Sequence, residues 1–255
     1  TNRGVRFQIT GNNSVVDVAD GGLLANLSAL SGSGFTWSKT GAGTLLLQDP
    51  TPNSNPAHTY RNTTLAAGTL KITNSFGKDH ATLRPTMLAS NGATFGGAGT
   101  LHQYNVTMLD GSTLDPGFSA GILTIRENLT LSSATTSLFE IGGTGRGSGY
   151  DAVVVSNALF LDGEIIVSLI NGYSPAYGDT FDLLDWGTLT DNGYSLTLPG
   201  LDAGLSWDQS QFGSAGTLLV IPEPQALSLV LVGLAAMAIG RHRRGARTFG
   251  QERMR

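Results

Sequence analysis

The chain has 255 residues with a formal net charge of −4, contains 35 glycines and no cysteine, and only 13% of its residues are charged. A chain of this length can bury a sizeable core, in one elongated domain or in two compact ones. The lack of cysteine excludes disulfides and thiolate-ligated metals. Six arginines lie after residue 240, so the body before them is markedly acidic, which argues against nucleic-acid binding.

Short strands separated by turns are expected near the start of the chain. Val5–Ile9 and Ser14–Val18 fit strands, with glycine- and asparagine-rich turns around them. Leu23–Leu30 fits either a helical turn or a pair of strands.

The triplet Gly-Thr-Leu then recurs. It begins at Gly43, Gly68 and Gly99, and a Gly-Ile-Leu variant begins at Gly121, which gives spacings of 25, 31 and 22 residues. Glycine supplies the bend, and threonine and aliphatic side chains fit a half-buried strand. This period predicts an all-β fold in which residues 1–135 form a right-handed parallel β-solenoid, whose rungs bury their inner faces by stacking. An antiparallel β-sandwich is the alternative.

Residues 35–72 carry a longer motif that spans two of these triplets. They resemble the autotransporter-associated β-strand repeat, also called the passenger-associated transport repeat, and the resemblance implies a β-solenoid. The loop at residues 49–56 departs from the family because it is longer and richer in proline. The matching residues are Trp37, Lys39, Gly41, Gly43, Thr44, Leu45, Leu47, Tyr60, Thr64, Ala67, Gly68, Thr69 and Leu70.

From about residue 136 the pattern changes. Residues 142–149 predict a flexible glycine-rich loop, and the segments 150–154 and 178–184 resemble a β-rich module that follows such repeats in exported bacterial proteins. We expect residues 136–221 to cap the open end of the solenoid, which would otherwise expose unpaired backbone groups. The strands expected here are Ser137–Ile141, Asp151–Ser156, Leu159–Leu161, Glu164–Ile170, Thr180–Trp186, Ser195–Leu198 and Thr217–Ile221.

Three features follow the body in a fixed order. Pro222-Glu223-Pro224 ends the last expected strand, since proline has no N–H for the ladder. Residues 226–240 carry no charge, and an arginine cluster follows them directly. We expect a single transmembrane helix over residues 225–240, in which snorkelling arginines extend a length of roughly 22 Å towards the ~30 Å of a hydrocarbon core. The alternative, a buried core helix, is disfavoured because the segment has no polar face.

Residues 222–244 resemble the PEP-CTERM sorting signal, which exosortase recognises in Gram-negative bacteria. The resemblance implies anchoring in the inner membrane during export, cleavage near the Pro-Glu-Pro motif, and a final place at the cell surface or outside the cell. The basic tail, residues 245–255, is longer than is usual for the family. The matching residues, which would act as substrate and not as catalyst, are Pro222, Glu223, Pro224, Arg241, Arg243 and Arg244.

Patterns that could carry chemistry are weak. Residues 117–121 have the form Gly-x-Ser-x-Gly of a nucleophile elbow, but a strand is expected after them and His242 is the sole later histidine. Asp151, Asp179, Asp182 and Asp185 could offer oxygen ligands to Ca²⁺, yet they lack a known ligand spacing. No metal-ligand spacing links the histidines, His58, His80, His102 and His242. We therefore predict no catalytic residue, cofactor or metal site.

The sequence thus predicts a non-enzymatic cell-surface or extracellular-matrix protein of structural or adhesive type. Its expected partners are exosortase and the inner membrane, with an extracellular polysaccharide as a further candidate and no nucleic acid. The alternative is a β-solenoid polysaccharide lyase or glycoside hydrolase with the same tail, which needs a groove with clustered carboxylates or basic side chains.

Overall fold

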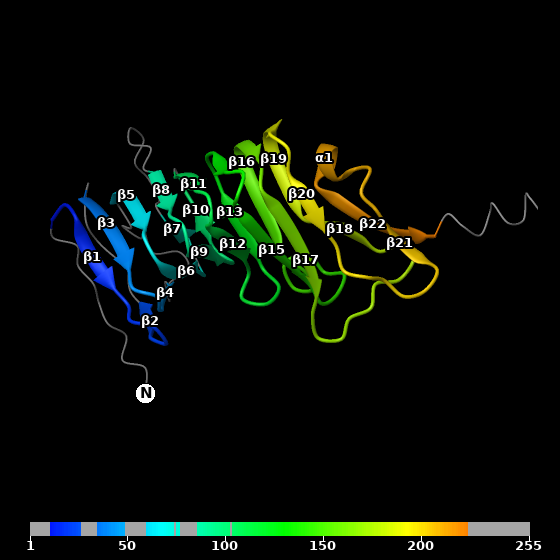
Figure 1. Cartoon of the computed structure of the whole chain (residues 1–255), viewed down its shortest axis with the longest axis horizontal. Coiled ribbons are helices and arrows are strands. Elements are labelled where there is room, and N and C mark those ends of the chain that lie inside the picture. Colours follow the sequence, from blue (N-terminus) through cyan, green and yellow to red (C-terminus); the bar gives the residue numbers. More distant parts are fainter. Residues whose placement is uncertain are drawn as a thin grey trace, which may run out of the picture.

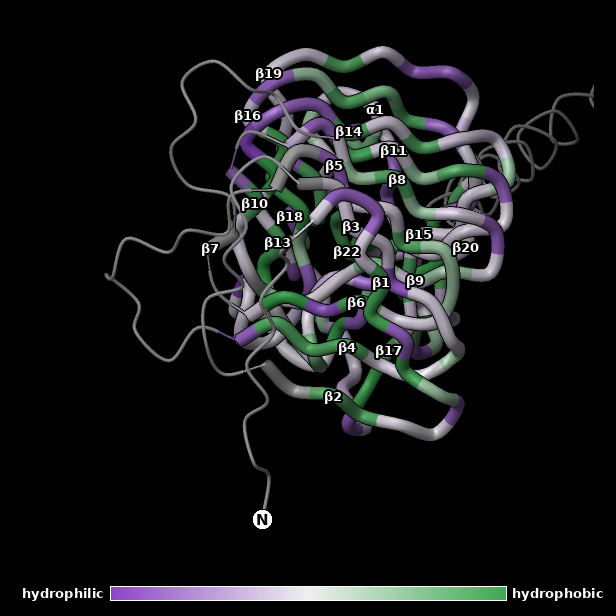
Figure 2. Tube along the Cα trace, turned by 90° about the vertical axis from the view of Figure 1, so that its left-hand side faces the viewer, coloured by the Kyte–Doolittle hydropathy of each residue, from purple (hydrophilic) through white to green (hydrophobic). Residues whose placement is uncertain are grey.

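The computed structural model describes residues 11–26, 35–48, 60–73, 75–76, 86–102 and 104–223, in which strands and tight turns dominate. Figure 1 shows an elongated stack, along which the chain advances from the first strand at one end to a small antiparallel sheet at the other. Seen along the stack, successive turns of the chain superpose (Figure 2).

Two sheets of parallel strands run along the stack, and we call them face 1 and face 2. In spatial order, face 1 contains β1 (Ser14–Asp17), β3 (Phe35–Thr40), β5 (Tyr60–Leu65), β8 (Thr86–Ala89), β11 (Asn105–Met108), β14 (Leu129–Leu131), β16 (Ala152–Leu161) and β19 (Leu184–Asp191). Face 2 contains β2 (Leu23–Asn26), β4 (Thr44–Leu47), β6 (Gly68–Ile72), β9 (Ala93–Gly97), β12 (Thr113–Pro116), β15 (Thr136–Ile141), β17 (Glu164–Leu169) and β20 (Ser195–Thr197). Parallel pairing throughout both faces is consistent with a β-solenoid and not with an antiparallel sandwich.

A third, shorter parallel ladder, face 3, closes the cross-section. It contains β7 (Ser75–Phe76), β10 (Thr100–Leu101), β13 (Ile122–Ile125) and the first half of β16. The second half of β16 pairs with β14, so this long strand joins face 3 to face 1. One rung therefore runs through face 1, face 2 and face 3 before the chain steps to the next rung.

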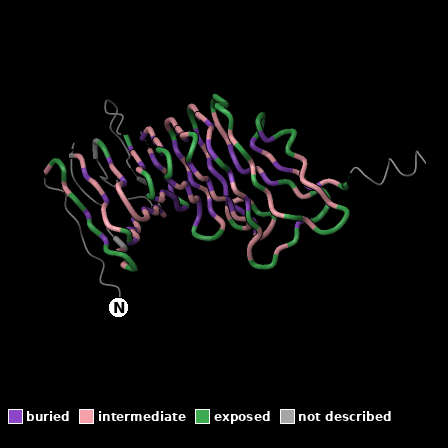
Figure 3. Tube along the Cα trace, viewed as in Figure 1, coloured by how far each residue is buried: buried purple, intermediate pink, exposed green. Residues whose placement is uncertain are grey.

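The core consists of side chains that point inward from the same position of successive rungs. On face 2, Leu45 lies beside Leu70, Leu70 beside Phe95, and Phe95 beside Leu114, and all four are buried. Successive side chains of a strand point to opposite faces, which produces the alternation of buried and half-buried residues in Figure 3. Each rung thus buries its apolar face against its neighbours, as expected for a stacked repeat.

Glycines with positive φ occupy the corner between face 1 and face 2 in nearly every described rung. A Cβ on Gly41 would lie 2.2 Å from the Val18 carbonyl oxygen, and a Cβ on Gly68 would lie 2.4 Å from the Gly41 carbonyl oxygen. At these two positions stacked rungs approach too closely for any side chain. The glycines of this corner are Gly21, Gly41, Gly68, Gly92, Gly111, Gly163 and Gly193.

Asparagine side chains join the rungs at the corner that leads into face 1. Asn62 Oδ1 accepts the Thr86 N–H at 3.2 Å, and Asn105 Oδ1 accepts the Asn128 N–H at 3.3 Å. Asn128 Oδ1 in turn accepts the Asn157 Nδ2 at 2.8 Å and the Ala158 N–H at 3.1 Å, at the point where β16 has a register shift. Because of this bulge, the hydrogen bonds made by the asparagine side chains continue from rung to rung into β16.

The triplets found in the sequence lie on two different faces. Those at Gly43 and Gly68 are in register on face 2, where Thr44 pairs with Thr69. The triplet at Gly99 lies on face 3, where Thr100 pairs with Thr124. The Gly121 variant is therefore two residues out of structural register, and the irregular 31-residue spacing comes from a change of face.

Several other expectations differ from the structure. The ambiguous segment after Leu23 begins with strand β2, and residues 113–116, for which no strand was expected, form β12. Parallel pairing does not stop at residue 135, where the sequence analysis ended the solenoid, because β15 pairs with both β12 and β17. The change in sequence pattern at 136 is therefore not a change of fold. The expected strand at residues 5–9 lies outside the described residues.

The glycine-rich loop at residues 142–149 is folded by its own hydrogen bonds and by one arginine. Gly142 and Gly147 donate N–H groups to the carbonyls of Gly149 and Tyr150 at 2.7 and 2.8 Å. Arg146 forms ion pairs with Asp182 at 3.1 Å and with Asp185 at 2.6 Å. The loop is thereby fastened to the next rung, which composition alone does not indicate.

An antiparallel sheet with a short helix, which we call the cap, lies at the C-terminal end of the stack (Figure 1). Its strand order is β18 (Thr180–Asp182), β22 (Thr217–Pro222), β21 (Leu205–Asp208), and α1 (Phe212–Ala215) precedes the central strand. Phe181 makes edge contacts with the rings of Tyr150, Tyr173 and Trp207. The expected capping module is thus smaller than residues 136–221, because most of that segment continues the stack.

We expect Gly68→Ala to lower the free energy of unfolding by more than Gly92→Ala. Both substitutions place alanine at a positive φ, which costs about 1–2 kcal/mol. A Cβ at Gly68 would in addition lie 2.4 Å from the Gly41 carbonyl oxygen, whereas a Cβ at Gly92 has nothing within 4 Å. We expect a loss of about 3 kcal/mol or more for Gly68→Ala, measured by urea denaturation. Equal losses would contradict close stacking at this corner.

Candidate functional site

The repeat motif places a lysine inside the stack. Lys39, on β3, has no exposed surface, and Trp37 on the same side of the strand is also buried. Lys39 Nζ donates hydrogen bonds to the carbonyl oxygens of Thr40 at 3.2 Å, Gly41 at 2.9 Å and Ala67 at 3.0 Å. Because these carbonyls belong to two successive corners, the ammonium group ties one rung to the next.

Burial lowers the pKa of Lys39, and the carboxylate of Asp17 opposes this shift. The ammonium loses water but gains three carbonyl oxygens, the usual compensation for a buried cation. The resemblance identified Lys39 as a motif residue, but its role appears only when the corner carbonyls of two rungs are placed together. Its environment is that of a structural group and not of a catalytic one.

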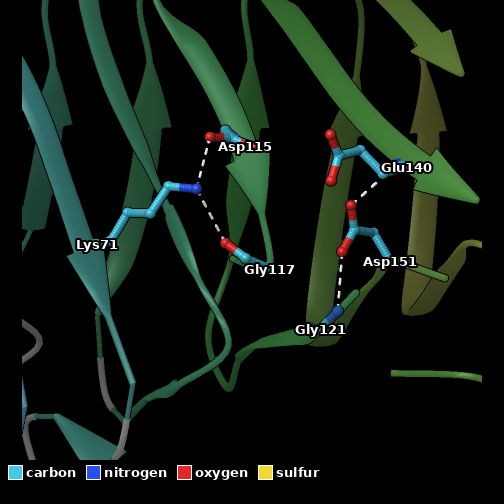
Figure 4. Close-up of polar contacts among 6 residues, drawn as sticks. All are labelled: Lys71, Asp115, Gly117, Gly121, Glu140 and Asp151. Carbon is cyan, nitrogen blue, oxygen red and sulfur yellow. Dashed lines mark hydrogen bonds and ion pairs between the residues drawn. The ribbon is translucent and has the colours of Figure 1, made fainter. Parts of the chain in front are cut away.

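A second lysine lies on the outer side of face 2. Lys71, on β6, forms an ion pair with Asp115 Oδ2, on β12, at 2.8 Å and donates to the Gly117 carbonyl at 3.0 Å. Its Nζ also lies 5.3 Å from the centre of the half-exposed Phe118 ring. Figure 4 shows that the lysine side chain crosses the intervening strand to reach these partners. That strand carries Gly96 beside Asp115, where a Cβ would lie 1.7 Å from the Asp115 carbonyl oxygen.

Asp151 is buried beside this ion pair and binds two backbone segments (Figure 4). Its Oδ1 accepts the Gly121 N–H at 2.8 Å, and its Oδ2 accepts the Glu140 N–H at 2.9 Å. A Cβ on Gly117 would lie 2.2 Å from Asp151 Oδ1, so the turn before Gly121 needs glycine there. The carboxyl group thus fastens the turn at residues 117–121 to β15.

Burial raises the pKa of Asp151 to about 7, the charges of Glu140 and Asp115 act in the same direction, and the two backbone hydrogen bonds act against it. A buried carboxyl with such a pKa is a candidate proton donor or acceptor. Both of its oxygens are, however, engaged by the chain itself. Lys71 is engaged in the same way, which favours a structural role for the cluster formed by Lys71, Asp115, Glu140 and Asp151.

The nucleophile-elbow pattern fails in the structure as expected. Ser119 is exposed in the turn after β12, and the next element is strand β13 and not a helix. An elbow requires the strand–turn–helix arrangement to present its serine.

The four aspartates considered as Ca²⁺ ligands do not form one site. Asp151 binds backbone N–H groups, Asp182 and Asp185 pair with Arg146, and Asp179 accepts the Tyr173 hydroxyl at 2.7 Å. This contact and burial raise the pKa of Tyr173 to about 12. Among the residues that the structure describes, no group of three or more histidine, aspartate or glutamate side chains could hold a metal ion. His102 follows β10, and His58, His80 and His242 lie outside the described residues.

The Pro-Glu-Pro motif begins inside the cap. Pro222 is the last residue of β22 and lies opposite Leu205 of β21, and the Glu223 N–H donates to the Gly204 carbonyl at 2.9 Å. Both side chains are exposed.

The rest of the tail cannot be placed. Pro224, Arg241, Arg243, Arg244, the expected transmembrane helix at 225–240 and the tail at 245–255 lie outside the described residues. Within the part of the chain that is described, no helix is both long and apolar enough to cross a membrane. No family model matches the chain, and no curated protein matches it.

We expect Lys39→Met to be far more destabilising than Lys71→Met. The first change leaves three carbonyl oxygens of half-buried corner residues without their donor and should lower the free energy of unfolding by about 2–4 kcal/mol. The second removes a partly exposed ion pair, worth about 1 kcal/mol. Urea denaturation of both variants tests this, and similar losses would show that the buried ammonium does not join the rungs.

The stability difference between the wild type and Asp151→Asn should depend on pH. Because the folded state raises the pKa of Asp151, the stabilisation from its bound proton is complete below the ordinary value of 3.8 and is lost as the pH rises through about 7. Over this interval the wild type should lose up to about 4 kcal/mol relative to the variant, which has no proton to release.

The measurement is urea denaturation of both proteins across that pH interval. Asparagine places an NH₂ group against one of two backbone donors, so the comparison uses the pH dependence and not the absolute stability. Asp110→Asn is the control, because Asp110 is exposed and asparagine keeps the oxygen that accepts the Ala134 N–H. A pH-independent difference for Asp151→Asn would contradict the assignment.

Proposed function

We propose that the protein is an exported, non-enzymatic cell-surface or extracellular-matrix protein of structural or adhesive type. Its right-handed β-solenoid body is delivered by a C-terminal signal of the PEP-CTERM kind. The observation that carries this proposal is the position of the motif: the last strand of the body ends at Pro222, and an apolar segment and an arginine cluster follow in the sequence. A folded body followed at once by such a tail has the layout of an anchored export substrate.

The construction of the body supports a structural role. Parallel ladders join the described rungs to one another, Lys39 adds a link between two of them, and asparagine side chains link several others. A rod of this kind needs neither a disulfide nor a metal to persist outside the cell. Exosortase and the inner membrane are the proposed partners during export, with an extracellular polysaccharide as a later one.

The second candidate function is a polysaccharide lyase or glycoside hydrolase. One observation favours this candidate, namely a group of charged side chains on one side of the stack (Figure 4). The group consists of Lys71, Asp115, Glu140 and Asp151. No sequence pattern indicates this grouping, because the four residues come from three different rungs. Their engagement with the chain favours the structural proposal.

Expression of the full chain in a host with exosortase should yield a protein that has lost its tail. Mass spectrometry of the C-terminus should then find an end near Pro222–Pro224, and Glu223→Ala should leave more of the chain uncut. Asp110→Ala, which also removes an exposed acid but lies in the body, should be processed normally. The same host without exosortase should retain the whole chain in its membrane. A chain that ends at Arg255 and does not associate with membranes would contradict the proposal.

A further inference from the structure

The first two residues of the sorting motif are held in the cap. β22 is the central strand of the cap, and on the β18 side its backbone bonds reach Val220, which donates its N–H to the Asp179 carbonyl at 2.9 Å and accepts the Gly178 N–H at 3.0 Å. On the other side β21 continues to pair with it as far as Pro222, and the Glu223 N–H donates to Gly204 beyond that. The end of β22 beyond Val220 is therefore held by β21 alone.

This arrangement explains how a proline fits in a central strand. In an antiparallel ladder hydrogen-bonded pairs alternate with non-hydrogen-bonded pairs. The bond from Glu223 to Gly204 makes Leu205 and Pro222 a non-hydrogen-bonded pair, so no donor is needed from Pro222 towards β21. Towards β18 the ladder has already ended, and the missing N–H costs nothing there either.

The strand that holds the motif is itself well anchored. The indole Nε1 of Trp207, on β21, donates to the Pro199 carbonyl at 2.8 Å, and its ring packs on Phe181. By contrast, the side chains of Pro222 and Glu223 are exposed and contribute little packing. Opening at this point therefore means that the end of β22 separates from β21, and not that β21 leaves the cap.

The sequence provides no spacer between this sheet and the apolar segment. Pro224 and Gln225 alone separate Glu223 from the uncharged run at residues 226–240. A peptidase that reads the motif must bind its backbone, yet the backbone of Pro222 and Glu223 lies against β21. Cleavage of folded proteins generally proceeds through a locally opened state and follows its population.

We propose that the cap regulates removal of the tail: Pro222 and Glu223 are cleaved or recognised only after they separate from β21. This inference rests on the proposed sorting function and names the regulation of that same site. The folded cap slows removal of the tail. The sorting peptidase binds the motif only in the small fraction of molecules in which Pro222 and Glu223 have separated from β21.

The test compares two insertions of the same flexible Gly-Ser linker in the full chain. Between Ile221 and Pro222 the linker frees the motif from the sheet, and cleavage in an exosortase-bearing host should become about five- to tenfold faster, the value expected for loss of one net hydrogen bond. Within the exposed Asn171-Gly172 turn the linker leaves the cap pairing intact, and cleavage should keep the wild-type rate. In the uncut protein the Glu223 amide should also exchange its hydrogen more slowly than an unpaired amide.

The outcomes separate the two proposals. If both insertions and the wild type are cleaved at one rate, or if the Glu223 amide is unprotected, the sorting function stands and regulation by the cap is wrong. If none of the three chains is cleaved, the sorting function itself is wrong, and the regulation falls with it. Faster cleavage in the Ile221–Pro222 insertion alone supports both.

Discussion

The close approach of successive rungs at the glycine corner between face 1 and face 2 is the constraint on which the structure depends. At Gly41 and Gly68 the Cα atoms lie so near the carbonyls of the preceding rung that a Cβ would overlap them. Once these corners stack, the strands on either side are fixed in register, and the inward columns of leucine and phenylalanine align. The same approach brings the carbonyls of two corners within reach of a single ammonium group, which explains how the Lys39 side chain can be buried.

Register also decides which polar side chains meet. Lys71 and Asp115 lie on strands separated by one intervening strand, and they pair because Gly96 leaves the space between them open. Asp151 reaches two earlier segments of the chain through their backbone N–H groups. These contacts cost little in a stacked repeat, since the ladders on each side already order the groups that form them. They add cross-links between rungs where the backbone turns away from the parallel pairing.

Part of this architecture could be predicted from the sequence. The Gly-Thr-Leu triplets at Gly43 and Gly68 identified two adjacent rungs correctly, because both triplets begin strands of face 2 that pair in register. The later triplets, at Gly99 and Gly121, do not continue this register. A rung has three faces, and the same triplet can begin a strand on any of them. Strand β12 was missed because Asp115-Pro116-Gly117 has turn residues, although Leu114 continues an inward column. The cluster around Asp151 could not be predicted, because no local pattern indicates which distant backbone groups a buried carboxyl will meet.

One strand of the cap, β22, belongs both to the antiparallel sheet and to the start of the tail. An open solenoid end exposes a row of unpaired backbone groups, and the antiparallel sheet with its aromatic cluster around Phe181 lies at the C-terminal end of the stack. Its central strand, β22, is also the strand from which the tail departs, so the hydrogen bond from Glu223 to Gly204 that completes the sheet also holds the start of the tail. Stability of the cap and accessibility of the motif therefore oppose each other. Under the proposed sorting function, stronger pairing at the end of β22 would stabilise the cap sheet and, by the same contacts, withdraw Pro222 and Glu223 from the sorting peptidase.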